Sequence, residues 1–327
     1  MNNNIIITGG AGFIGYHLAK KLVEKNYKII ILDNLSRGNY DNELKNLLKN
    51  KNIQFLKKNL QKEIRIKNLK SVKYIYHLAG SVGVKNINKD AYKAFLNNIL
   101  TLKNIIEFNK NLNNKAKLIL FSTSEVYSSL IKKNLVKFPI TEKNEIIIEN
   151  KIIDRDAYYL SKIFNEKLVQ LSGFKHIILR PHNIYGPRMG YSHVIPELIK
   201  KIFLEKKRNI KKNTVVFSPQ HTRAFCYIDD AINQIISLAN SKTNNEIYNV
   251  GNMREEIKII ELAKKIKKLV FKDSNLLKGS ITLGSPKRRV PDMKKTIKKM
   301  KSRQFIDIDQ GLFKTVNWYL RKLKNEK

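Results

Sequence analysis

The chain has 327 residues, a formal net charge of +37 and a single cysteine, Cys226. This length is enough for one large domain or two closely joined domains, and the lack of an apolar run of 18 residues argues against a membrane-spanning helix. One cysteine cannot form an internal disulfide, which predicts a reducing compartment and therefore a cytoplasmic protein.

The positive charge is spread along the whole chain in pairs of lysines. A surface that binds nucleic acid would be clustered, so we expect a solvated basic surface and no nucleic-acid partner. The abundance of Asn, Ile and Lys indicates a coding bias toward A and T. The charge would still attract anionic substrates by long-range steering.

The first 33 residues have the pattern of a dinucleotide-binding βαβ unit. An apolar strand over residues 5–8 leads into glycines at three-residue spacing, and a helical pattern and a second strand over 28–32 follow. Gly9 permits the tight turn, Gly12 lets the backbone approach a pyrophosphate, and Gly15 lets the helix pack closely on the strand. The pyrophosphate would lie on the N–H groups at the start of the helix.

The second strand ends on Asp33. A carboxylate at this place accepts hydrogen bonds from the adenosine ribose, which favours NAD over the 2′-phosphorylated NADP. Arg37 lies nearby and could weaken that preference.

Strand and helix patterns alternate through the first half of the chain, which is typical of a parallel α/β sheet. Further strands are predicted at residues 53–56, 74–78, 118–122 and 177–180, and helices at 91–110 and 157–172. We expect a Rossmann doubly wound sheet over residues 1–186, with 216–249 returning to it. Residues 187–327 would form a smaller C-terminal substrate-binding lobe over the ends of the strands, where such sheets bind ligands.

A candidate general base lies in the predicted helix 157–172. Tyr158 and Lys162 are four residues apart, so both side chains lie on one helix face. The lysine ammonium favours the phenolate and lowers a pKa that starts near 10, which yields a base able to take a hydroxyl proton near neutral pH. Tyr159 does not fit this role because the residue four places further on is Ile163.

Hydroxyl groups and a carboxylate follow the predicted strand 118–122, in the run Ser122-Thr123-Ser124-Glu125-Val126-Tyr127. This is the edge of the sheet where α/β enzymes place their chemistry. Thr123 could share a hydrogen bond with the substrate hydroxyl that Tyr158 deprotonates. The same residues could instead cap a turn or a helix.

Together these motifs resemble an extended short-chain dehydrogenase/reductase, specifically the NAD-dependent nucleotide-sugar epimerase/dehydratase family. The resemblance runs nearly from end to end. It is carried by Thr8-Gly9-Gly10-Ala11-Gly12-Phe13-Ile14-Gly15, Asp33-Asn34-Leu35, His77-Leu78-Ala79, Asn98 opening a helix, Thr123-Ser124-Glu125-Val126-Tyr127, Tyr158 with Lys162, Arg180-Pro181-His182-Asn183-Ile184-Tyr185-Gly186-Pro187-Arg188, Thr222-Arg223-Ala224-Phe225-Cys226-Tyr227-Ile228-Asp229-Asp230 and Arg289-Val290-Pro291-Asp292.

The resemblance implies a role for each matching residue. Tyr158 would be the base, Lys162 would bind the nicotinamide ribose and lower the pKa of Tyr158, Thr123 would hold the sugar hydroxyl, and Glu125 would complete the catalytic group. The residues implied to bind NAD are Gly9, Gly12, Phe13, Ile14, Gly15, Asp33, Asn34, Asn59, Leu60, Leu78, Ala79, Asn98, Ser122, Tyr158 and Lys162.

The resemblance also implies substrate and partner residues. Asn183, Arg223 and Arg289 would bind the nucleotide diphosphate, to which guanidinium groups donate forked hydrogen bonds. Asn59 stands where the family usually has an acid that contacts adenine, so an amide would make that contact. No metal site is expected.

Several reactions share the chemistry that the resemblance implies, in which Tyr158 removes the C4 hydroxyl proton while the C4 hydride passes to NAD. The 4-keto sugar can then be epimerised, lose a C6 carboxylate or lose water. Family dehydratases have Asp-Glu after the Thr, whereas this chain has Ser124-Glu125, which disfavours dehydration. The Thr-Ser-Glu-Val-Tyr run and the segment at Arg289 resemble UDP-glucuronate decarboxylases, but 4-epimerases are commoner and need only Tyr158, Lys162 and Thr123. We predict a nucleotide-sugar 4-epimerase, with a UDP-glucuronate decarboxylase and then a 4,6-dehydratase as alternatives.

A hypothesis from another class is a non-catalytic Rossmann protein that binds a dinucleotide or RNA. The intact set of Tyr158, Lys162 and Thr123 argues against it, because a binding module has no need of all three. The predicted helices 91–110 and 157–172 carry apolar residues beyond one face. The resemblance implies that they pair across a two-fold axis as a four-helix bundle, which predicts a homodimer.

Overall fold

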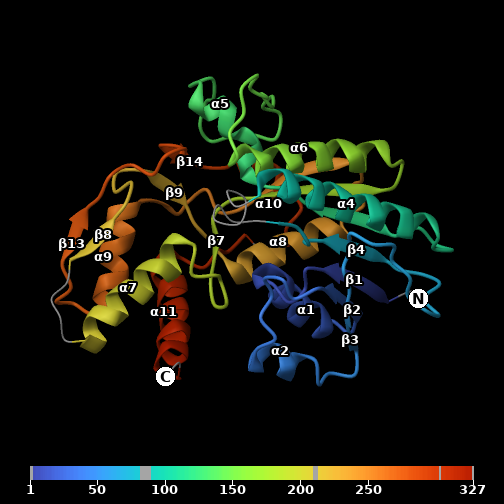
Figure 1. Cartoon of the computed structure of the whole chain (residues 1–327), viewed down its shortest axis with the longest axis horizontal. Helices are drawn as coiled ribbons and strands as arrows, with labels where there is room; N and C mark the ends of the chain where they lie inside the picture. Colours follow the sequence, from blue (N-terminus) through green and yellow to red (C-terminus); the bar gives the residue numbers. More distant parts are fainter. Residues whose placement is uncertain (1–2, 82–89, 209–212, 302, 326–327) are drawn as a thin grey trace. The chain divides into compact units, whose positions relative to one another are not determined.

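The computed structural model describes residues 3–81, 90–208, 213–301 and 303–325 (Figure 1). The chain divides into two compact units whose segments alternate along the sequence. Unit 1 comprises Met1–Leu130, Glu145–Pro181 and Ile232–Tyr248, and unit 2 comprises Ile131–Asn144, His182–Ala231 and Asn249–Lys327.

Unit 1 is built on a seven-stranded sheet in the order β11-β6-β5-β4-β1-β2-β3. Its strands are β1 (Asn4–Thr8), β2 (Lys28–Asp33), β3 (Ile53–Lys57), β4 (Tyr74–His77), β5 (Lys117–Phe121), β6 (His176–Pro181) and β11 (Glu246–Val250). Each neighbouring pair from β3 to β6 is parallel. The order 3-2-1-4-5-6 is that of the doubly wound dinucleotide-binding fold, so the predicted Rossmann sheet is confirmed.

The strands form where the sequence has short, almost continuous apolar runs. Ile5, Ile6 and Ile7 of β1 are buried, and β5 is buried along its whole length. Parallel sheets are covered on both faces, so their strands lack the alternation of a half-exposed strand. The glycine loop follows β1 at the centre of the sheet, beside the point where the strand order reverses and ligands bind.

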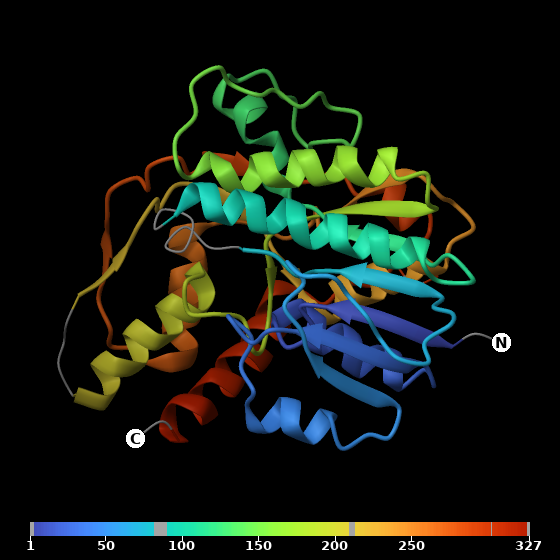
Figure 2. The same cartoon turned by 45° about the vertical axis from the view of Figure 1, so that its right-hand side comes forward.

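The helices of unit 1 are α1 (Phe13–Val23), α2 (Asn42–Leu47), α4 (Ala91–Lys110), the 3₁₀ helix η1 (Ser124–Tyr127) and α6 (Asp156–Leu171). The short α5 (Ser128–Lys132), the helix α8 (Ile228–Asn240) and β11 each contain residues of both units. Asp90 caps α4 by accepting a hydrogen bond from the backbone of Lys93, as favoured N-cap residues do. Helices α4 and α6 lie side by side and contact each other along their length (Figure 2).

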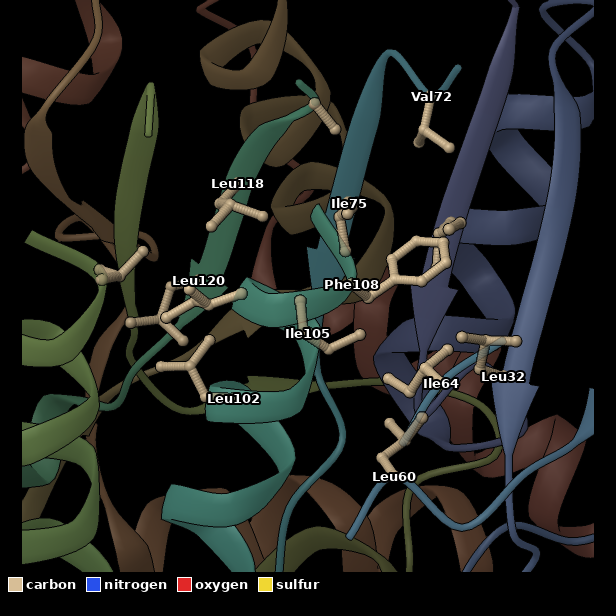
Figure 3. Packing of buried hydrophobic residues seen from close by; sticks show 14 of the residues in the cluster. Leu32, Leu60, Ile64, Val72, Ile75, Leu102, Ile105, Phe108, Leu118 and Leu120 are labelled. Carbon is tan, nitrogen blue, oxygen red and sulfur yellow. The ribbon is translucent and has the colours of Figure 1, made fainter. Parts of the chain in front are cut away.

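One apolar cluster joins α4 to the sheet (Figure 3). It contains Leu102, Ile105 and Phe108 from the helix, together with residues of the strands such as Leu118 and Leu120. Burying a side chain of this size contributes about 1.5–3 kcal/mol. The cluster fixes β5, and therefore also the start of the segment that carries Thr123.

In its described residues, unit 2 contains smaller sheets and three long helices. Its strand pairs are β7 (Ile184–Tyr185) with β10 (Cys226–Tyr227), β9 (Thr222–Ala224) with β12 (Glu256–Lys258) and β14 (Arg288–Arg289), and β8 (Thr214–Val216) with β13 (Leu276–Lys278). Helices α7 (Val194–Arg208), α9 (Ile259–Val270) and α11 (Ile308–Asn325) contact one another, and α10 (Lys294–Ile297) is a single turn. Within the described residues, no helix combines the length and the apolar character that crossing a membrane requires.

Candidate active site

The glycine loop after β1 leaves no room for a side chain at Gly9 or Gly15. Gly9 has a φ of +68°, and a Cβ on Gly15 would lie 2.4 Å from the carbonyl oxygen of Gly9. Gly12 is the N-cap of α1, where no side chain makes a capping bond and the first turn holds no acidic residue. The N–H groups and the positive dipole end of α1 are therefore suited to a pyrophosphate. The predicted residues Phe13 and Ile14 form the first turn and are half-buried.

Asp33 is buried at the end of β2 and holds two backbone segments. Its carboxylate oxygens accept hydrogen bonds from the N–H groups of Ala11, at 3.0 Å, and Leu35, at 2.8 Å. Each oxygen retains a further lone pair that can accept a ribose hydroxyl. Asn34 is exposed, and its side chain accepts a hydrogen bond from Ser36 N.

The loops after β1 and β4 touch each other. The Thr8 hydroxyl accepts hydrogen bonds from the N–H groups of Leu78 and Ala79, both at 3.1 Å. A Cβ on Gly9 would lie 2.9 Å from Ala79 N. These two loops therefore approach each other closely, between the N-terminus of α1 and Asp33. This arrangement fits a dinucleotide.

His77 is a buried neutral residue beside these two loops. The Thr8 hydroxyl already accepts two hydrogen bonds, so its one proton is donated to His77 Nδ1, at 3.0 Å. The ring proton is therefore on Nε2, which has no partner among the described residues. Burial, and then the Lys162 cation, lower the pKa of His77 to about 3. His77 is thus uncharged throughout the physiological range.

Asn59 and Leu60, which are predicted to bind the cofactor at the end of the third strand, differ from each other in exposure. Asn59 is exposed, and its side-chain oxygen accepts a hydrogen bond from Gln61 N at 3.1 Å. The side chain of Leu60 is buried in the apolar cluster under the sheet, and its carbonyl accepts from Asn104 Nδ2. Any contact of Leu60 with a nucleotide would therefore be made by its backbone.

Tyr158 and Lys162 occupy successive turns of α6, as predicted. The Lys162 ammonium is buried, donates to the carbonyl of Phe121 at 2.9 Å and lies 5.9 Å from the centre of the Tyr158 ring. Burial lowers the pKa of Lys162 to about 8, although Glu166 acts in the opposite direction. Lys162 is therefore still a cation at pH 7.

Thr123 caps η1 and is buried. Its hydroxyl oxygen accepts a hydrogen bond from Glu125 N at 3.2 Å, which leaves the hydroxyl proton able to donate to a substrate oxygen. The carboxylate of Glu125 is half-buried. Ser122 donates its hydroxyl proton to Glu166 at 2.5 Å, a partner that the sequence analysis did not identify.

Asn98 lies well inside α4 and does not open the helix, which corrects that detail of the motif. Its side-chain oxygen accepts from Ser81 N at 2.6 Å, and its amide donates to Ser161 Oγ at 2.8 Å and to Ser81 O at 3.2 Å. The side-chain amide of Asn98 thus donates one hydrogen bond to the loop after β4 and one to α6. Asn98 joins these two parts of unit 1.

Sequence patterns do not reveal an ion pair that lies next to the candidate catalytic residues. Glu166 and Arg180 are almost completely buried, and their closest atoms are 2.6 Å apart. The sequence indicates Arg180 only as part of a motif and gives no role to Glu166. The available signal was an acidic residue one helical turn beyond Lys162, in a segment otherwise rich in apolar residues.

The three predicted diphosphate-binding residues lie in unit 2. Strands β9 and β14 place Arg223 and Arg289 directly opposite each other in register. The Arg223 guanidinium is oriented by bonds to Thr222 O and Ser285 Oγ, both at 2.7 Å. Asn183 donates to Ala224 O at 3.2 Å, on the same strand β9. Two neighbouring guanidinium groups are well suited to a diphosphate.

No group of three or more His, Cys, Asp or Glu side chains in the described ranges could hold a metal ion. The chemistry that these residues can perform is proton transfer at Tyr158, hydrogen bonding from Thr123 and binding of a dinucleotide and a diphosphate.

Comparison with known proteins agrees with this geometry. Residues 5–251 match the model of the NAD dependent epimerase/dehydratase family. The chain is 30% identical to the UDP-N-acetyl-alpha-D-glucosaminuronate decarboxylase of Bacillus cytotoxicus, with 100% of both chains covered. It is also 30% identical to a putative UDP-glucose 4-epimerase of Methanocaldococcus jannaschii, over 96% of this chain and 97% of that protein.

A solved structure shares the whole fold. The UDP-glucuronic acid 4-epimerase of Bacillus cereus, in complex with UDP-glucuronic acid and NAD, is 25% identical and has a TM-score of 0.80, over 98% of this chain and 99% of that one. The protein is thus similar over its full length to both epimerases and decarboxylases. It belongs to the NAD-dependent epimerase/dehydratase family, an enzyme family that acts on nucleotide sugars, and its cofactor is NAD.

Proposed function

We propose that the protein oxidises C4 of a nucleoside-diphosphate sugar, and that this sugar is a uronate whose C6 carboxylate is then lost as carbon dioxide. The observation that carries the proposal is the turn formed by Thr123, Ser124 and Glu125, whose sequence resembles that of UDP-glucuronate decarboxylases. The end-to-end similarity to the decarboxylase of Bacillus cytotoxicus supports it. A net charge of +37 also suits a substrate that carries both a diphosphate and a carboxylate.

Proton removal in the first step uses residues of unit 1. Tyr158, as a phenolate, takes the proton of the C4 hydroxyl, and the Lys162 cation favours that phenolate. Thr123 donates a hydrogen bond to O4. The glycine loop and Asp33 would hold NAD, which would supply the hydride acceptor and donor when bound. Arg223 and Arg289 would hold the diphosphate.

The second step follows from the chemistry of the 4-keto uronate, which is a β-keto acid. The C5–C6 bond breaks, carbon dioxide leaves, and the electron pair is delocalised from C5 onto O4. Hydrogen bonds from Thr123 and from the now protonated Tyr158 stabilise the negative charge on O4. A proton then adds to C5, and Tyr158 returns its proton to O4 as C4 is reduced, which gives a pentose.

A 4-epimerase, the reaction predicted from the sequence, is the second candidate. It needs no group beyond Tyr158, Lys162 and Thr123, and the similarity to a putative UDP-glucose 4-epimerase favours it.

The two candidates differ in the mass of the product. Purified protein would be incubated with NAD and UDP-glucuronate, UDP-N-acetylglucosaminuronate, UDP-glucose or UDP-N-acetylglucosamine, and the products analysed by NMR and mass spectrometry. Loss of carbon dioxide from a uronate supports the proposal. An isomer of unchanged mass with an altered C4 proton coupling shows a 4-epimerase, and conversion of the neutral sugars alone would overturn the uronate assignment.

Variants of α6 test whether the site is catalytic. Tyr158→Phe should lower turnover by about 100-fold or more, whereas Tyr159→Phe, which removes the neighbouring hydroxyl, should leave it nearly unchanged. Lys162→Met should also lose turnover. A non-catalytic binding protein would show no turnover in the wild type, and Tyr158→Phe would leave its affinity unchanged.

We also infer a homodimer through α4 and α6, because both helices expose apolar side chains. Tyr92 and Phe164 are 75% and 51% exposed, and Leu171 at the end of α6 is 84% exposed. Light scattering at micromolar concentration should give twice the monomer mass, and Phe164→Glu should reduce it. A monomeric wild type would contradict this inference. The cytoplasmic location stays a prediction.

A further inference from the structure

A buried polar cluster lies beneath the candidate catalytic residues of unit 1. Arg180 donates two hydrogen bonds to Glu166, from Nε to Oε1 at 2.9 Å and from Nη2 to Oε2 at 2.6 Å. Ser122 donates to the same Oε1, and Arg180 Nη1 donates to the Tyr127 hydroxyl at 2.7 Å. All four side chains are buried. Forked, charge-assisted bonds fix the relative positions of their partners, so the cluster joins α6, β6, η1 and the end of β5.

The cluster holds the segment that carries Thr123 at both ends. Ser122 immediately precedes Thr123, and Tyr127 closes η1 two residues after Glu125. One end of this segment is therefore attached to Glu166, and the other end is attached to Arg180. The position of the Thr123 hydroxyl depends on a contact that lies outside the segment itself.

Glu166 also faces Lys162. The two residues are four apart on α6, so they lie on the same helix face one turn apart. A buried ammonium is costly unless an opposite charge lies near it, and the carboxylate of Glu166 raises the pKa of Lys162 against the effect of burial.

We propose that Glu166 and Arg180 are positioning residues of the active site: their ion pair fixes the segment that presents Thr123, and Glu166 supplies the negative charge that holds the Lys162 cation beside Tyr158. The part that concerns Thr123 rests on the proposed function. The part that concerns Lys162 can be tested through NAD alone.

Other titratable and charged groups lie on the elements that surround Lys162. His77 at the end of β4 is neutral, Arg180 on β6 is a permanent cation, and Tyr158 precedes Lys162 by one turn. The titratable residues of η1 are Glu125 and Tyr127. Helix α4, which also packs against α6, presents the uncharged Asn98 to it, and its charged residues Lys93, Lys103, Glu107 and Lys110 are exposed. Glu166 is the acidic residue on the same face of α6 as Lys162.

The experiment measures NAD affinity against pH by calorimetry, using the whole chain. In the wild type, NAD binding should weaken as the pH rises through the pKa of Lys162, which is about 8. In Glu166→Gln this fall should occur about one pH unit lower, because removal of a nearby opposite charge shifts a pKa by about one unit or more. Asn109→Ala is the matched control. It removes a buried side chain that bonds both backbone groups of Ala116, away from the cluster.

Two further variants keep the test decisive. If Glu166→Gln does not fold because Arg180 is left unpaired, the double variant with Arg180→Met removes both charges. The fall should again move to lower pH, but by less, because loss of the Arg180 cation acts in the opposite direction on the pKa of Lys162. Tyr127→Phe leaves every charge in place, so it should lower turnover several-fold and leave the pH dependence of NAD binding unchanged.

The outcomes separate this proposal from the proposed function. If no nucleotide sugar is converted by the wild type, the proposed function fails while the NAD titration still reports on Glu166. A folded Glu166→Gln or double variant with the wild-type pH dependence overturns the role of Glu166. A Tyr127→Phe variant with wild-type turnover overturns the role of the cluster in presenting Thr123.

Discussion

Replacing Lys162 by Met should make the protein more stable while it abolishes turnover. The Lys162 ammonium is 3% exposed, and burial lowers its pKa from 10.5 to about 8. A shift of this size corresponds to about 3 kcal/mol of unfavourable free energy in the folded state when the side chain is charged. Loss of the hydrogen bond to Phe121 O would cost about 1 kcal/mol. The net gain at pH 7 is therefore about 2 kcal/mol, or about 3 °C in Tm for a chain of this length.

The gain in stability of Lys162→Met over the wild type should depend on pH. The folded-state pKa of Lys162 lies below the unfolded value, so the penalty is fully present below pH 8 and fades as the pH rises toward 10.5. Thermal unfolding of nucleotide-free protein should therefore show Lys162→Met above the wild type at pH 7 and close to it at pH 10. Lys167→Met, at an exposed position of the same helix, should change little at either pH. A variant less stable than the wild type at pH 7, or an equal gain at both pH values, would refute the reasoning.

Further predictions concern the two ligand-binding regions. Gly15→Ala should weaken NAD binding by about tenfold or more in calorimetry, because its Cβ would lie 2.4 Å from a backbone oxygen of the glycine loop; Gly190→Ala, where a Cβ meets nothing within 4 Å, should not. Asp33→Asn should reduce the preference for NAD over NADP by about tenfold, since it removes the repulsion of a 2′-phosphate; an unchanged ratio of dissociation constants would contradict this. Arg223→Met and Arg289→Met should each weaken UDP binding by about tenfold or more. They should leave NAD binding unchanged, because the predicted NAD residues lie in unit 1 and both arginines lie in unit 2. Equal losses of affinity for both ligands would refute that separation.

The sequence was sufficient for the parts of the fold that local patterns encode. The strand β1, the glycine loop and Asp33 follow one another within 33 residues, and the spacing of Tyr158 and Lys162 needs only a helix to place both on one face. Apolar runs bounded by turns located the strands of the parallel sheet for the same reason.

Contacts made through tertiary structure could not be predicted in this way. Glu166 and Arg180 meet only because α6 packs against the sheet beside β6. Arg223 and Arg289 become neighbours through the pairing of two short strands, β9 and β14, that are far apart in the sequence. Asn98 was recognised by its motif, but its bonds to the loop after β4 required the folded position of α4.

The charges buried near Tyr158 connect stability with catalysis. Among the buried side chains, Lys162 and Arg180 contribute two positive charges, Glu166 contributes one negative charge and His77 is neutral, which leaves one excess positive charge while Tyr158 is protonated. The Arg37 cation also interacts with Tyr158 and adds to this excess. Formation of the Tyr158 phenolate reduces that excess. In the proposed mechanism, the Lys162 cation lies beside a phenolate in the state that takes the substrate proton, so part of the free energy that it costs the resting fold is recovered there, as expected for a group whose interactions favour the reacting state over the ground state. In that mechanism, the same lysine that lowers the stability of the folded chain lowers the barrier to proton transfer.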